Sequence, residues 1–150
     1  MKIRIYLANL GKYNEGFLIG KWVPLPVSDQ ELQEAFERIG VSDKPNENGE
    51  YYEEYFITDY EAPFNIGEYD SIQKLNDKVE LYHELVEQYN DEIVDALLED
   101  NNLQEISSMD IVIYNSSDEL VDEYLENMLD DNIYNEIYPY FDRDKWLSDF

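Results

Sequence analysis

The stretch Ile3-Arg4-Ile5-Tyr6-Leu7-Ala8 alternates apolar and polar side chains, which is the pattern of a β-strand with one buried face. Turn residues fill positions 9–16, after which residues 17–23 resume as a second strand. Residues 52–58 alternate again as a third strand, and residues 59–64 leave it towards the next region. The sequence therefore predicts a small N-terminal sheet.

A helix is predicted between the second and third strands. Ser28 and Glu31 have the spacing of a capping box, and Gly40 is suited to end the helix. The apolar residues between them fall on one face: Leu32, Ala35, Phe36 and Ile39. We also expect Trp22, in the second strand, to lie in the core, so that the N-terminal part is mixed α and β.

From residue 71 the apolar spacing becomes helical. Apolar residues recur at intervals of three and four, and acids take the other face; the apolar positions are Leu75, Val79, Tyr82, Leu85, Val86 and Tyr89. A second short helix is predicted over residues 91–99 and a strand over residues 111–114. A helix of about a dozen residues follows the capping residues 115–117, with an apolar stripe of Leu120, Val121, Tyr124, Leu125 and Met128. An aromatic tail, residues 133–150, ends the chain.

The charge of the chain is large and unevenly placed. Its 150 residues hold 36 Asp and Glu against 10 Lys and Arg, a net charge of −26, yet 43% are apolar and 15% aromatic, enough to build packed cores. Six acids and six bases lie in residues 1–45, so the whole excess lies in residues 46–150. Such an excess repels nucleic acid and anionic membranes, and it therefore predicts a basic partner.

Several functional classes are disfavoured by composition. The chain has no cysteine and one histidine, His83, which we expect to be exposed; thiolate chemistry is excluded and a Ser-His-Asp triad is disfavoured. No signal peptide or membrane span is apparent, and we expect a cytoplasmic protein without cofactor, metal or catalytic residues.

The acidic helices carry a repeated internal cost. From Val79 to Asp142 there is no lysine or arginine, so pairs such as Glu80/Glu84 and Glu119/Glu123 repel one another by a few tenths of a kcal/mol (about 0.2–0.5) instead of attracting. Four interpretations compete. A calcium loop lacks its spacing and glycine, a carboxylate-pair hydrolase has no distinguishing pair, and a halophilic surface should extend over residues 1–45. The fourth, imitation of DNA, predicts an elongated multi-domain chain with carboxylates spaced like phosphates.

Two blocks of sequence resemble the ArdA antirestriction proteins of conjugative elements. The first is Ile5-Tyr6-Leu7-Ala8-Asn9-Leu10-Gly11-Lys12-Tyr13-Asn14-Glu15-Gly16 followed by Gly20-Lys21-Trp22, and the second is Tyr55-Phe56-Ile57-Thr58-Asp59-Tyr60-Glu61-Ala62-Pro63-Phe64, with Glu68-Tyr69-Asp70-Ser71-Ile72 and Leu75-Asn76 after it. The acidic helix Leu120-Val121-Asp122-Glu123-Tyr124-Leu125-Glu126 is similar to the antirestriction motif of that family, and Tyr140-Phe141-Asp142-Arg143-Asp144 to its C-terminal region.

The resemblance implies an α+β fold made as an elongated chain of three small domains. These would be a mixed α/β domain over residues 1–61, a helical domain over residues 62–103 and an acidic α/β domain over residues 104–150. Family members usually continue past the Asp-Arg-Asp stretch, so we expect a shortened third domain here, through which the family pairs into a dimer.

The resemblance also implies a function, which is inhibition without catalysis. A DNA mimic would occupy the DNA-binding groove of a type I restriction-modification enzyme, block restriction, with modification as a second reaction that it could block, and protect DNA of a mobile element such as a conjugative transposon. The carboxylates expected to contact the enzyme are Glu80, Glu84, Glu87, Asp91, Glu92, Asp118, Glu119, Asp122, Glu123 and Glu126. The alternative is an acidic binding module for another basic DNA-binding or nucleoid protein.

Overall fold

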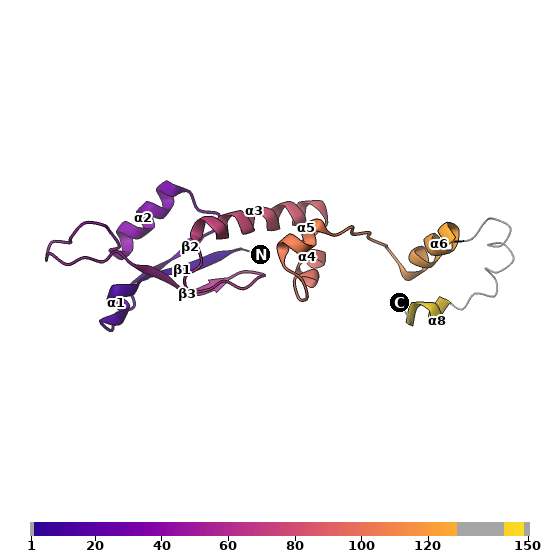
Figure 1. Ribbon diagram of the computed structural model, residues 1–150, viewed down its shortest axis with the longest axis horizontal. Coiled ribbons are helices and arrows are strands. Elements are labelled where there is room, and N and C mark those ends of the chain that lie inside the picture. Colours follow the sequence, from indigo (N-terminus) through magenta and orange to yellow (C-terminus); the bar gives the residue numbers. More distant parts are fainter. Residues whose placement is uncertain (1, 129–142, 149–150) are drawn as a thin grey trace. The chain divides into compact units, whose positions relative to one another are not determined.

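The structure is a computed structural model, which describes residues 2–128 and 143–148 (Figure 1). The chain divides into two compact units, Met1–Met109 and Asp110–Phe150. Each unit is described by itself below. The fold is mixed α and β, as predicted, while the division into three domains at residues 61 and 103 stays a proposal.

A three-stranded antiparallel sheet forms the N-terminal half of the first unit. Its order is β2-β1-β3, with β1 (Arg4–Asn9) between β2 (Gly20–Pro24) and β3 (Tyr55–Glu61). Ile5 and Leu7 of β1 are fully buried, as the alternation predicted. The third strand begins three residues later than expected and continues to Glu61, where Arg4 holds it: the guanidinium donates from Nε and Nη2 to the two carboxylate oxygens of Glu61 at 2.7 and 2.9 Å.

The prediction that Trp22 lies in the core is wrong. Trp22 is half-buried, and the Arg4 guanidinium carbon lies 4.1 Å from the centre of its ring. Tyr6 meets the same ring edge-on, with centroids 5.3 Å apart. Tyr6 and Trp22 are opposite each other in the β1–β2 register, so both belong to the face of the sheet that bears Arg4 and not to the face that bears Ile5 and Leu7.

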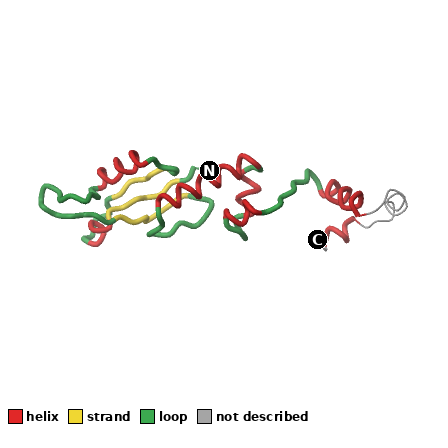
Figure 2. Tube along the Cα trace, turned by 45° about the horizontal axis from the view of Figure 1, so that its top comes forward, coloured by secondary structure: helices red, strands yellow, loops and turns green. Residues whose placement is uncertain are grey.

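Helix α2 (Asp29–Ile39) packs against β2 and has the predicted ends (Figure 2). The Ser28 hydroxyl accepts from the Glu31 amide at 3.1 Å, which is the N-cap bond of the capping box, and donates to the Glu31 carboxylate at 3.0 Å. Gly40 ends the helix at φ +77°, a conformation in which a side chain would be strained. The capping and stop residues in the sequence therefore predict both ends of this helix correctly.

A short helix, α1 (Leu10–Asn14), stands where turn residues were expected. It begins at Asn9, whose buried side chain makes two hydrogen bonds. The Asn9 Oδ1 accepts from the Lys12 amide at 3.0 Å, and the Asn9 Nδ2 donates to the Ile39 carbonyl at 2.9 Å. Asn9 thus joins the end of β1, the start of α1 and the end of α2.

We expect the substitution Asn9→Ala to lower the free energy of unfolding by about 2 kcal/mol, because it removes a helix cap and leaves the Ile39 carbonyl without its donor. Urea denaturation followed by circular dichroism measures this. Asn14→Ala, an exposed change in the same helix, is the control and should cost less than about 0.5 kcal/mol. Equal losses in the two variants would contradict the role given to Asn9.

The helical half of the first unit is built on α3 (Ile72–Gln88), with α4 (Asp91–Leu97) and α5 (Leu103–Ser108) in contact with it (Figure 1). The predicted apolar face of α3 is confirmed: Leu75, Val79, Tyr82 and Leu85 are buried, with Val86 and Tyr89 half-buried. Helix α4 also matches its prediction, with Val94 fully buried; α5 was not predicted. Asn76 of α3 exchanges two hydrogen bonds with the Val27 backbone, of 2.9 and 2.8 Å.

The second unit contains α6 (Ser117–Met128) and α8 (Arg143–Ser148), which contact each other. The strand predicted over residues 111–114 is not formed. Val112 and Ile113 are 59% and 47% exposed, and no strand lies beside this run in the described part of the unit. An apolar, β-branched run becomes a strand only where a neighbour accepts its hydrogen bonds.

Helix α6 has the predicted length, but its apolar stripe is narrower than expected. Val121 and Leu125 are fully buried, whereas Tyr124 is 37% exposed. Of the aromatic tail, residues 133–142 and 149–150 lie outside the described residues. None of the described helices is long and apolar enough to cross a membrane.

Candidate functional site

Helix α3 carries a row of exposed carboxylates on the side away from its core. Glu80, Glu84 and Glu87 are all exposed, as the helical spacing predicted, and Asp77 precedes them. Steps of three and four residues along a helix advance about 4.5 and 6 Å. The residues that bear the row are therefore held at regular intervals by a helix whose opposite face is buried.

Two more of the predicted acids, Asp91 and Glu92, open helix α4. Both are exposed and stand in its first turn, where negative charge interacts favourably with the helix dipole. The Asn90 side chain caps the same turn by accepting from the Ile93 amide at 2.8 Å. These two carboxylates consequently help to stabilise α4, whether or not they contact a partner.

The acids of α3 and α4 are not neutralised within their own unit. Residues 2–109 contain two ion pairs with a nitrogen–oxygen distance of at most 4.0 Å, Arg4–Glu61 and Lys12–Glu15. None of the five predicted carboxylates of α3 and α4 takes part in either pair. Their charge is therefore exposed to solvent and accessible to a cationic surface.

A hydrogen bond that sequence reasoning missed connects α4 to α3. The Tyr82 hydroxyl donates to the Asp95 carboxylate at 2.7 Å, and burial, followed by this bond, raises the pKa of Tyr82 well above its usual range. The available signal was a tyrosine on the buried face of a helix, because such a hydroxyl needs a partner. The bond positions α4, and with it Asp91 and Glu92.

The other five predicted acids lie on α6, in the second unit. Four of them are exposed and Asp122 is half-buried; the five are Asp118, Glu119, Asp122, Glu123 and Glu126. Two of these acids also hold the structure of the unit. Glu119 accepts from the Asn115 amide at 2.9 Å while its own amide donates to Ser116 Oγ at 3.2 Å, and Glu123 accepts from the Tyr114 hydroxyl, which raises the pKa of that tyrosine.

The structure thus gathers the predicted residues into two groups, one on α3 and α4 and one on α6. No group of three or more His, Asp or Glu side chains among the described residues has the arrangement of a metal site. His83 is exposed on α3, as expected. The described acids of both groups present negative charge over helical surfaces.

Comparison with known proteins gives one family. The model of the antirestriction protein ArdA matches residues 5–150, which spans both units and both groups of acids. No curated protein matches the chain.

Proposed function

We propose that this chain, which belongs to the ArdA family of antirestriction proteins, inhibits a type I restriction-modification enzyme by occupying its DNA-binding groove in place of DNA. The observation that carries the proposal is the exposed row of unpaired carboxylates on α3. Its charges follow one another about every 4.5–6 Å along the helix. This spacing is wider than the axial rise per phosphate of one DNA strand, about 3.4 Å, but of the same order. The protein would act as a stoichiometric inhibitor, not as an enzyme.

The proposed partner-binding residues are ten carboxylates on two separate surfaces, one on α3 and α4 in the first unit and one on α6 in the second. Binding to a basic groove would be steered by long-range attraction and weakened by salt. Such an inhibitor would act in the cytoplasm, where DNA of a mobile element enters a cell that holds the enzyme. Blocking the groove should affect methylation as well as cleavage, because both reactions require bound DNA.

A titration of a purified type I enzyme tests this function. With DNA in slight excess, an equimolar amount of the protein should suppress cleavage and methylation, and the suppression should fall as salt is raised from about 50 to 200 mM. Undiminished activity at equimolar protein would overturn the proposal. If a nucleoid protein were displaced from DNA instead, the alternative of a general acidic binding module would hold.

We also propose that the chain forms a homodimer through its second unit. Val112 and Ile113 are exposed although they are apolar, and a second copy would remove them from water. We expect Val112→Asp with Ile113→Asp to convert a dimer into a monomer in light scattering after gel filtration. Tyr51→Asp, at an exposed aromatic residue of the first unit, is the control and should leave the mass unchanged. A monomeric unsubstituted chain would refute the dimer.

A further inference from the structure

The first turns of α3 carry two lysines in an otherwise acidic part of the chain. Lys74 and Lys78 are the only basic residues between Lys44 and Arg143, and both are exposed. In residues 2–109 neither lies within 4.0 Å of a carboxylate. Even the adjacent Asp77 accepts its hydrogen bond from the Gln73 amide, at 3.3 Å. Within residues 2–109, neither ammonium group therefore has an ion-pair partner.

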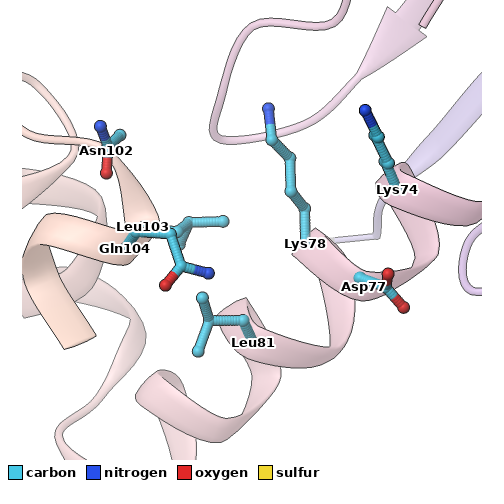
Figure 3. A pocket seen from close by; sticks show the side chains of 7 residues that line it. All are labelled: Lys74, Asp77, Lys78, Leu81, Asn102, Leu103 and Gln104. Carbon is cyan, nitrogen blue, oxygen red and sulfur yellow. The ribbon is translucent and has the colours of Figure 1, made fainter. Parts of the chain in front are cut away.

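Both lysines border a groove between α3 and the start of α5, of about 400 Å³ (Figure 3). Leu81 and Leu103 supply its apolar part, and the amides of Asn102 and Gln104 lie across from the lysines. The Lys78 ammonium also lies 5.6 Å from the centre of the Phe64 ring, which borders an adjoining hollow. Asp77, which accepts from the Gln73 amide, also lines the groove, and Asn102 Nδ2 donates to Glu105 Oε1 at 2.9 Å. The groove thus combines two cations, one carboxylate that already has a donor, side-chain amides and a short apolar surface.

This combination fits a carboxylate carried on a short aliphatic stem. Ammonium and amide groups donate to the carboxylate oxygens, and leucine side chains contact the stem. A glutamate or aspartate side chain of another protein has this chemistry. A second copy of this chain is the less favourable source, because the dimer proposed above forms through the second unit, whereas this groove lies in the first.

We propose that this groove binds an acidic side chain of the partner protein and thereby fixes the direction in which the carboxylate row of α3 docks. The inference rests on the proposed function. A row of carboxylates alone meets a basic groove almost equally well in several registers and in both directions. Two cations at one end make the wrong placements unfavourable, since lysines would then face lysines or arginines of the enzyme.

Replacing the two lysines with glutamates distinguishes this inference from simple DNA imitation, because the two predict opposite changes in inhibition. Lys74→Glu with Lys78→Glu makes the net charge more negative by four, so an inhibitor that relied on negative charge alone would improve. We expect the concentration that half-inhibits the type I enzyme to rise about tenfold instead. The matched control, Lys21→Glu with Lys44→Glu, adds the same charge at exposed lysines elsewhere in the unit and should inhibit as well as the unsubstituted chain or better.

Two further measurements keep the test decisive. Lys74→Gln with Lys78→Gln removes the two cations without introducing carboxylates, so the net charge becomes more negative by only two. This variant should weaken inhibition about threefold, with circular dichroism to confirm folding. Carbodiimide coupling in the complex should link Lys74 or Lys78 to an aspartate or glutamate of the enzyme. If the unsubstituted chain inhibits and both lysine variants inhibit equally well, this inference alone is wrong; if the unsubstituted chain does not inhibit, the proposed function fails with it.

Discussion

Replacing Glu80, Glu84 and Glu87 with glutamine is expected to raise the concentration that half-inhibits a type I enzyme about 100-fold. The three residues form the exposed, unpaired row on α3. If each contact with a cation of the groove contributes about 1 kcal/mol, losing three costs about 3 kcal/mol, and every 1.4 kcal/mol or so is a factor of ten. Inhibition of DNA cleavage, titrated at one fixed salt concentration, measures the effect.

The matched control for this triple variant removes the same charge from the N-terminal part. Glu34, Glu37 and Glu47 are exposed and lie outside both groups of predicted contact residues. Their replacement by glutamine should change the half-inhibiting concentration less than about threefold. Equal losses in the two triple variants would show that net charge, and not the row on α3, governs inhibition. Because glutamine is a good helix former, α3 should remain folded in the test variant.

The second large effect concerns the core of the second unit. Val121 and Leu125 are its fully buried apolar side chains among the described residues, and a unit of this length can build only a small core. We expect Leu125→Ala to cost about 2–5 kcal/mol and to unfold α6 while the first unit stays folded. Hydrogen exchange followed by mass spectrometry should then show loss of protection in peptides of α6 and none in peptides of β1 or α3.

Leu120→Ala serves as the control for this variant, because Leu120 is only half-buried on the same helix. Its protection pattern should resemble that of the unsubstituted chain. Loss of protection in both units of the Leu125→Ala variant would contradict the expectation that the first unit stays folded when α6 unfolds. Inhibition should fall with α6, since its five acids would no longer be held on one helix.

The helices that were predicted correctly are those whose signals are local. Ser28 and Glu31 at capping-box spacing, with Gly40 beyond, located α2 because cap and stop residues act on their own backbone. The three-and-four spacing from Leu75 to Leu85 located α3 and assigned its acids to the exposed face. The short helix α5 was not predicted, because its six residues are too few to show the apolar periodicity of a helix, although Asn102 is a recognisable cap.

The errors have a different origin, which is dependence on distant parts of the chain. Residues 111–114 have the composition of a strand, yet a strand forms only if another lies beside it. Trp22 was placed on the wrong face because alternation says which residues share a face and not which face is covered. The hydrogen bond of Asp95 with Tyr82 joins two helices, and that of Glu123 with Tyr114 joins α6 to the segment before it, so no spacing within one element reveals them.

The ion pair of Arg4 in the sheet affects whether the chain's own basic residues can bind its acidic helices and so prevent inhibition. A free arginine on the same chain would compete for the acidic rows at an effective concentration on the order of millimolar, far above that of any enzyme in a cell. Arg4 is not free in this way: it is bound to both oxygens of Glu61 and covers Trp22. By holding Arg4 in this pair, the sheet removes that arginine as an internal competitor for the acidic helices.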